Sequence, residues 1–166
     1  MVKIKYLIIA ILAVGIGVWA TVYLFPSEER KVKKQFNLLS EWVSKDSGEN
    51  TFTMAHKTRN LGSLFAEKFE LKTEIESMSG SYTSEEISSY AARGRFMFSY
   101  LSLSFYDLGI SFPEKGIAKV TLTARLKGRS TTGENFDETH ELECILKKIE
   151  KRWLFSHAEM VEVLKK

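Results

Sequence analysis

Residues 142–157, LECILKKIEKRWLFSH, carry the pattern that decides the fold. Apolar side chains alternate with polar ones up to Leu146, the charged segment Lys147–Arg152 follows, and apolar residues resume at Trp153. A period of two is typical of a strand with one buried face, and a short charged break between two such runs fits a hairpin turn. We therefore expect an antiparallel hairpin with Leu146, Trp153 and Phe155 in the core.

Other alternating segments precede this hairpin, and helical patterns come before them. The sequence predicts helices from Ser27 to Val43, from Phe52 to Glu67 and from the capping box Thr83–Glu86 to Phe98, and strands at 69–76, from Leu101 onward and at 120–126. Helices come early and antiparallel strands late, an order that indicates the α+β class. We expect a curved antiparallel sheet wrapped on two to three helices.

The element order and the end of the hairpin together resemble a known fold. In residues 148–157 a charged turn leads into Trp153, a hydrophobic residue follows two positions later, and His157 lies two beyond that. This pattern resembles the usual ending of the nuclear transport factor two-like proteins, which include ketosteroid isomerase and the polyketide cyclases. The resemblance covers the chain from about Ser27 to Leu164 and implies a cystatin-like cone. That fold hosts isomerases, dehydratases, cyclases and proteins without catalytic activity, so it implies no particular reaction.

The N-terminal part of the chain has a different character. No charged residue occurs from Tyr6 to Phe25, and a helix of this length crosses a hydrocarbon core of about 30 Å. We therefore predict a single transmembrane anchor over residues 1–26, followed by one domain over 27–166.

The basic residues around the apolar run bear on cleavage and orientation. Lys3 and Lys5 form a basic start, and the small residues in Val18-Trp19-Ala20 leave a cleaved signal peptide as an alternative. Counting basic residues favours a cytoplasmic domain, because four lie within 30–34 and only two precede the run. A short cationic start is nevertheless commoner in signal-anchors, and its export would move charge against the membrane potential. We predict an extracytoplasmic domain at the inner membrane, with a cytoplasmic domain as the alternative.

Charge and cysteine content exclude several kinds of partner. The chain has 24 basic and 21 acidic residues and a formal net charge of +3, which is too near neutrality for nucleic-acid binding. The single cysteine, Cys144, forms no intramolecular disulfide and lies in an alternating apolar segment, which indicates a buried thiol. No two of His56, His140 and His157 have the spacing of metal ligands. We therefore expect no metal and no cofactor.

Acid–base catalysis is the possibility that the resemblance raises, because isomerase-like members hold a carboxylate base and hydrogen-bond donors at the mouth of the cone. The candidate side chains are Asp107, Tyr106, His157, His140, Tyr90 and Tyr100. Asp107 either points into the cone, by its parity with Phe105, or ends its strand in a turn at Leu108-Gly109. His157 has the parity of Trp153, so we expect it inside as a core histidine. Neither has a partner at a catalytic spacing, and we assign no catalytic residue.

These considerations favour a membrane-anchored binding or scaffold domain over an enzyme. Eleven Phe residues suit a filled cone. Ile145, Ile149 and Leu154 have the opposite parity to the core positions, so we expect them on the outer side of the sheet, against a second copy or another protein. The alternative is a small-molecule or lipid-handling enzyme of the isomerase or cyclase type, with an open pocket in the cone.

Overall fold

The computed structural model describes residues 27–74 and 76–161. The chain divides into two compact units, Met1–Lys31 and Val32–Lys166, and the second contains the sheet and the core. The predicted membrane span from Tyr6 to Phe25 lies outside the described residues. None of the helices in the described ranges is both long and apolar enough to span a bilayer.

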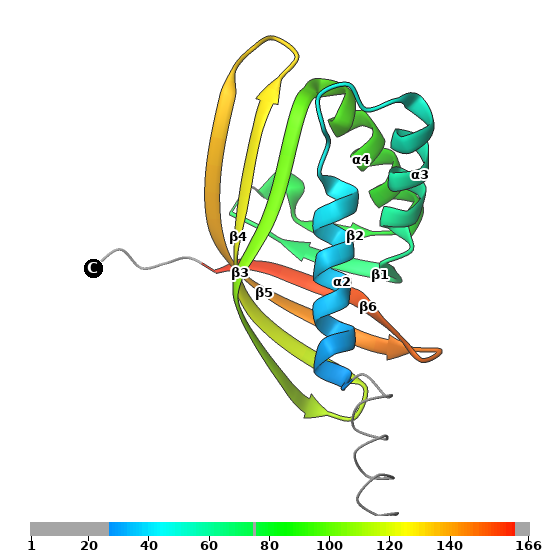
Figure 1. Ribbon diagram of the computed structural model, residues 1–166. Helices are drawn as coiled ribbons and strands as arrows, with labels where there is room; N and C mark the ends of the chain where they lie inside the picture. Colours follow the sequence, from blue (N-terminus) through cyan, green and yellow to red (C-terminus); the bar gives the residue numbers. More distant parts are fainter. Residues whose placement is uncertain (1–26, 75, 162–166) are drawn as a thin grey trace, which may run out of the picture. The chain divides into compact units, whose positions relative to one another are not determined.

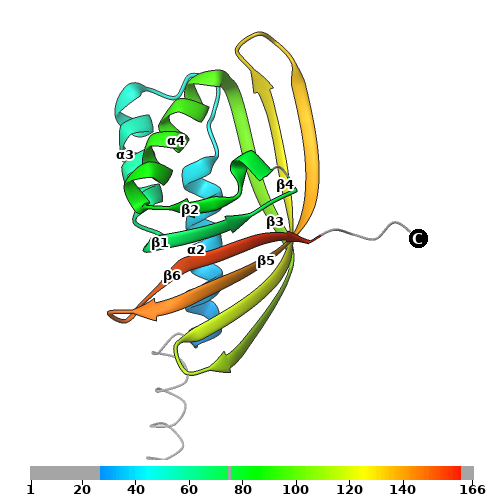
Figure 2. The same cartoon turned by 180° about the vertical axis from the view of Figure 1, so that it is seen from behind.

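The predicted helices and strands occur in the predicted order, but a 3-10 turn and a short strand are additional elements before the third helix, and the strand predicted at 69–76 lies at Phe65–Lys72. In the described ranges the elements are α2 (Glu28–Val43), α3 (Thr51–Gly62), β1 (Phe65–Lys72), the 3-10 turn η1 (Glu76–Met78), β2 (Gly80–Tyr82), α4 (Ser84–Met97), β3 (Phe98–Glu114), β4 (Ile117–Ser130), β5 (Asn135–Ile149) and β6 (Arg152–Val161). Figure 1 shows the long strands curving around the helices, and Figure 2 shows the same sheet from behind. The α+β prediction, with a curved sheet on three helices, is confirmed.

The sheet has the strand order β2-β1-β6-β5-β4-β3. Neighbouring strands pair antiparallel, except that β1 and β6 run parallel. The prediction of a purely antiparallel sheet is therefore wrong at this pair. The predicted second helix is also too long, since α3 ends at Gly62 and not at Glu67. Phe65 already pairs with Phe155 in the sheet, so the chain leaves the helix before that point.

The β5–β6 hairpin forms where the alternation predicted it. Glu150 and Lys151 make the turn with φ values of 49° and 68°. Two consecutive residues with positive φ give a turn whose twist matches that of the flanking strands. Leu146, Trp153 and Phe155 are buried, with exposed fractions of 0%, 2% and 2%, so their prediction as core residues is confirmed.

The core fills the space between α2 and the inner face of the sheet. Val32 and Phe36 are buried because the apolar positions of α2 recur at helical spacing and face the strands. The Phe36 ring makes edge contacts with Phe105 of β3 and Phe155 of β6, at centroid distances of 5.3 and 5.0 Å. Three aromatic rings from three separated segments therefore fix α2 against the sheet.

Gly62, at the end of α3, lies directly against α4. A Cβ at this position would be 2.5 Å from the carbonyl oxygen of Ser84 and closer still to the Ser88 hydroxyl. Alanine is a better helix former than glycine by about 1 kcal/mol, but the backbone of α4 has no room for it. We expect Gly62→Ala to lower the free energy of unfolding by about 1 to 3 kcal/mol, measured by urea denaturation of the full chain.

Gly94 provides the matched control for this change. It lies within α4, and a Cβ built on it meets no atom within 4 Å. Gly94→Ala should therefore raise the stability by about 0.5 to 1 kcal/mol. Equal gains from the two substitutions would show that the contact between α3 and α4 is looser than these distances imply.

Candidate functional site

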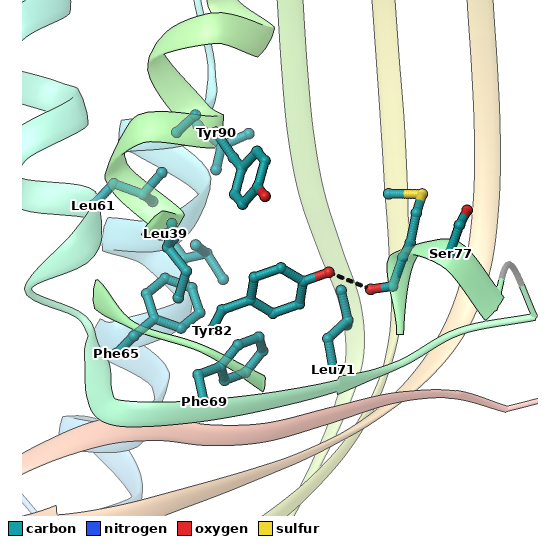
Figure 3. Close-up of a pocket in the computed structure, with 12 residues that line it drawn as sticks. Leu39, Leu61, Phe65, Phe69, Leu71, Ser77, Tyr82 and Tyr90 are labelled. Carbon is teal, nitrogen blue, oxygen red and sulfur yellow. Dashed lines mark hydrogen bonds between the residues drawn. The ribbon is translucent and has the colours of Figure 1, made fainter. Parts of the chain in front are cut away.

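A pocket of about 450 Å³ opens between the helices and the β1–β2 edge of the sheet. It is lined by Leu39, Val43, Leu61, Phe65, Phe69, Leu71, Ser77, Met78, Tyr82, Ile87, Tyr90 and Ala91. Figure 3 shows these side chains converging from α2, α3, α4, β1, β2 and η1. We call this cavity the apolar pocket.

Periodicity explains how these residues come to face the same space. Phe69 and Leu71 are two positions apart on β1 and therefore share one face of the strand. Ile87, Tyr90 and Ala91 are three and four positions apart on α4 and share one face of that helix. This apolar face of α4 therefore borders the cavity.

Two tyrosines supply the polar groups of the apolar pocket that reach furthest from the backbone. The Tyr82 hydroxyl donates to the carbonyl oxygen of Met78 at 2.7 Å, and its ring contacts the Tyr90 ring edge-on at 5.8 Å (Figure 3). Tyr90 and Met78 are 56% and 51% exposed, so they mark the mouth. The lining includes no carboxylate, imidazole, thiol, amine or guanidinium. The lining therefore suits an apolar molecule, and it lacks the side-chain types that most often act as general acids or bases.

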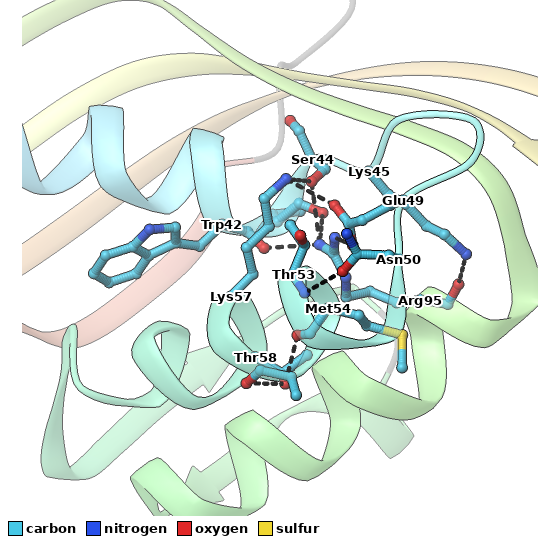
Figure 4. A network of polar contacts seen from close by, with 12 residues as sticks. Trp42, Ser44, Lys45, Glu49, Asn50, Thr53, Met54, Lys57, Thr58 and Arg95 are labelled. Atoms are coloured by element: carbon cyan, nitrogen blue, oxygen red, sulfur yellow. Dashed lines mark hydrogen bonds and ion pairs between the residues drawn. The ribbon is translucent and has the colours of Figure 1, made fainter.

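A buried ionic network joins the α2–α3 loop to α4 (Figure 4). Arg95 is 2% exposed and donates from Nη1 to the carbonyl oxygens of Trp42, Val43 and Ser44 at 2.8, 2.7 and 3.2 Å. Its Nη2 pairs with the Glu49 carboxylate. The carbonyl groups at the end of α2, which have no partner within the helix, are thereby satisfied.

Lys57 completes this network from α3. Its Nζ donates to Glu49 at 2.8 Å and to the carbonyl oxygen of Ser44 at 3.0 Å. Burial by itself raises the pKa of Glu49, but the hydrogen bonds from Arg95 and Lys57 outweigh it, so the pKa of this carboxyl is lowered. A carboxylate held ionised by two cations is no general base, and we assign the network to structure.

Asp107 lies on a bulge of β3 and not in the cone. The β3–β4 register shifts between Tyr106 and Gly109, and Asp107 has a φ of 54° and is exposed. The sequence left open whether Asp107 points into the cone or lies at an irregular turn, and the structure shows the irregularity. An inserted residue redirects the chain, which ends the alternation that carried Phe105 inward. Tyr106 is 49% exposed and lies near Arg125 of β4, away from the apolar pocket.

His157 faces the outer side of the sheet, so its prediction as an inward residue is wrong. Phe155 pairs with Leu146, but His157 pairs with Ile145, because Ser156 is an extra residue in β6. A bulge of this kind reverses the parity of the residues that follow it. His157 accordingly lies 3.9 Å from Glu70 and 3.6 Å from Glu159, two partly exposed carboxylates.

The remaining candidates are scattered. His140 lies on β5 next to Glu138, and Tyr100 is 40% exposed on β3. Only Tyr90 of the candidate residues borders the apolar pocket. The search for catalytic residues therefore missed this site, and the helical spacing of the apolar residues Ile87, Tyr90 and Ala91 is a signal that could have indicated it.

Ile145, Ile149 and Leu154 lie on the outer side of the sheet, as their parity predicted. Ile145 pairs with the outward-facing His157, and Leu154 pairs with Lys147. Ile149 is 43% exposed, whereas Leu154 is only 8% exposed. Leu154 is thus already covered within its own chain, so it offers little surface to a partner.

Neither metal nor thiol chemistry has a basis in the part of the chain that the structure describes. In residues 27–74 and 76–161 no three His, Cys, Asp or Glu side chains are arranged to hold a metal ion. Cys144 is 4% exposed, and burial raises its pKa to about 12. A thiol with such a pKa is not a nucleophile at neutral pH.

Comparisons with known proteins address the fold. Neither protein families nor curated proteins give a match to the sequence. Among solved structures, a putative calcium/calmodulin-dependent protein kinase II association domain from Xanthomonas campestris matches with a TM-score of 0.63 and 11% identity over 85% of this chain and 91% of that one. A putative scytalone dehydratase from Novosphingobium aromaticivorans matches with a TM-score of 0.63 and 18% identity, covering 82% and 85%.

A hexachlorocyclohexane dehydrochlorinase has a TM-score of 0.65 and 12% identity, covering 81% of this chain and 84% of its own. These neighbours have the cone fold of the nuclear transport factor two-like proteins, so the predicted fold is confirmed. At such identities the likeness concerns the fold alone. The neighbours include enzymes, and nothing in the comparisons supports the predicted membrane anchor.

Proposed function

We propose that this domain binds a small, largely apolar molecule in the apolar pocket. The observation that carries the proposal is a cavity of about 450 Å³ whose wall is made almost entirely of aliphatic and aromatic side chains. Ligand sites commonly have volumes of roughly 300 to 1,000 Å³ and predominantly hydrophobic linings. A cavity of this kind gains free energy by taking apolar surface out of water.

We propose ligand binding in preference to catalysis because of the side chains that line the apolar pocket. The hydroxyl groups of the lining belong to Ser77, Tyr82 and Tyr90. They are accompanied by none of the His, Asp, Glu or Lys side chains that most often act as general acids or bases. The descriptions of two neighbours as a dehydratase and a dehydrochlorinase support small-molecule use of this fold, while the lining favours a binding domain.

Three properties of the chain stay predictions. They are a membrane anchor between Tyr6 and Phe25, an extracytoplasmic location, and a protein partner at the outer face of the sheet. Ligand binding is compatible with each of them, because the apolar pocket lies on the side of the sheet covered by helices. Ile145 and Ile149 remain the residues through which a partner would be bound.

Filling the apolar pocket should abolish ligand binding. Ala91 lines the pocket from α4, and Ala91→Phe places a ring in the space that a ligand would occupy. The probe is 1-decanol, added to the full chain in zwitterionic lipid nanodiscs because residues 6–25 are apolar. Methyl NMR signals of Leu39, Leu61 and Ile87 should shift saturably in the wild type. In Ala91→Phe we expect the apparent affinity to fall at least tenfold.

Phe52→Ala is the matched control. Phe52 is 90% exposed at the start of α3 and does not line the pocket. Its replacement removes a large aromatic side chain without touching the cavity, so the decanol titration should match that of the wild type. Equal binding by the wild type and Ala91→Phe would overturn the proposed site.

A further inference from the structure

We propose that the ligand of the apolar pocket is an anionic amphiphile, such as a medium-chain carboxylate, whose head group binds Arg93 at the mouth. This inference rests on the proposed function and names the chemical class of the ligand. It starts from the exposed guanidinium of Arg93 beside the opening, which has no ion-pair partner in the described part of the chain.

Arg93 stacks against a residue of the mouth. Its guanidinium carbon lies 5.8 Å from the centroid of the Tyr90 ring, and its side chain is exposed. Tyr90 both lines the apolar pocket and reaches solvent, at 56% exposure. A group that leaves the pocket alongside the Tyr90 ring therefore comes within reach of the long Arg93 side chain.

No protein carboxylate competes for Arg93 in the described part of the chain. The residues three and four positions away on α4 are Ser89, Tyr90, Phe96 and Met97. None is acidic, and within residues 27–74 and 76–161 Arg93 has no ion-pair partner. Glu86, one turn further back, is engaged in the capping box with Thr83. The guanidinium is thus available to a ligand carboxylate, which it can bind with two parallel hydrogen bonds.

The lining of the apolar pocket decides where the charge of the ligand must lie. A charged head group inside it would lose its hydration without gaining a counter-ion, which costs several kcal/mol. The apolar tail must therefore enter first, and the head must stay at the mouth. The volume of about 450 Å³ lies within the roughly 300 to 1,000 Å³ that sites for small organic molecules commonly have.

The test compares decanoate with 1-decanol, which share a tail and differ in the head group. Both are titrated into the full chain in zwitterionic nanodiscs, with the methyl signals of Leu39 and Ile87 as the readout. Each apparent affinity is divided by that of the wild type for the same ligand, so partition into the lipid cancels. For Arg93→Gln we expect decanoate to bind about three- to fivefold more weakly, the size of an exposed ion pair. The affinity for 1-decanol should stay within twofold of the wild type.

Two further variants sharpen the comparison. Arg93→Glu should weaken decanoate more than Arg93→Gln does, because attraction becomes repulsion. Arg59→Gln is the matched control, since Arg59 is an exposed arginine of α3 that does not line the apolar pocket. It should leave both ligands unaffected. Raising the salt concentration should weaken decanoate binding in the wild type and in Arg59→Gln, but not in Arg93→Gln.

The outcomes separate this inference from the proposed function. If neither ligand shifts the pocket methyl signals, the proposed function fails. If 1-decanol binds but Arg93→Gln weakens decanoate no more than Arg59→Gln does, the pocket stands and the role of Arg93 is overturned. Tighter binding of decyltrimethylammonium than of decanoate would overturn the anionic head group, with Glu76 of η1 as the competing charge at this edge.

Discussion

Replacing Arg95 with Met is expected to lower the free energy of unfolding by about 3 to 5 kcal/mol, the usual cost of removing one member of a buried ion pair. Arg95 and Glu49 have side chains only 2% and 3% exposed. The substitution would leave the Glu49 carboxylate with Lys57 as its remaining cation and remove the donors for three carbonyl groups at the end of α2. Urea denaturation of the full chain, followed by circular dichroism, measures the effect.

An exposed ion pair provides the control. Arg125 pairs with Asp137 at 2.8 Å, but both side chains are substantially exposed, at 40% and 45%. Arg125→Met should therefore change the stability by less than about 1 kcal/mol. The double change Arg95→Met with Glu49→Met should recover part of the loss, because two apolar side chains need no partner. If Arg95→Met lowers the free energy of unfolding no more than Arg125→Met does, the ionic network does not stabilise the fold.

The same network makes the stability depend on pH. Because the folded pKa of Glu49 is lowered, its contribution is fully present above the ordinary glutamate pKa of about 4.3. It is lost as the pH falls through the lower folded value, where the carboxylate takes up a proton and its bonds to Arg95 and Lys57 weaken. In Arg95→Met this part of the acid sensitivity should diminish.

The alternation of the last hairpin predicts the inward direction of Leu146, Trp153 and Phe155 because a regular strand has a fixed period of two. It fails at His157 because Ser156 is an inserted residue, and the pairing with β5 alone reveals the insertion. The orientation of Asp107 stayed open for the same reason, since a bulge on β3 lies at that residue. Register is a property of two strands, and the pattern of one strand does not contain it.

The sequence did not predict the apolar pocket or the ionic network, for a different reason. The predicted filling of the cone by Phe residues is correct for Phe36 and Phe155, which are buried together. Phe65 and Phe69 instead line an open cavity. Whether an apolar face meets a neighbour or a space depends on how far α4 lies from β1. Arg95 and Glu49 are likewise 46 positions apart, and only the tertiary fold brings them together.

Trp153→Ala should lower the free energy of unfolding by about 3 to 5 kcal/mol, the range for removing a large buried aromatic side chain. The indole is 2% exposed and belongs to the main core. Its ring lies 5.7 Å from that of Phe112 on β3, and Lys148 covers it with Nζ 5.9 Å from its centroid. Truncation would leave a cavity that strands held at both ends cannot close.

Two measurements distinguish this loss of packing from an effect on ligand binding. Phe52→Ala removes an aromatic side chain that is 90% exposed, so its unfolding free energy should stay within about 0.5 kcal/mol of the wild type. Trp153 does not line the apolar pocket, so folded Trp153→Ala should still bind 1-decanol with the affinity of the wild type. A wild-type denaturation midpoint in Trp153→Ala would mean that the indole does not support the core, and the inward direction of residue 153 would then be wrong.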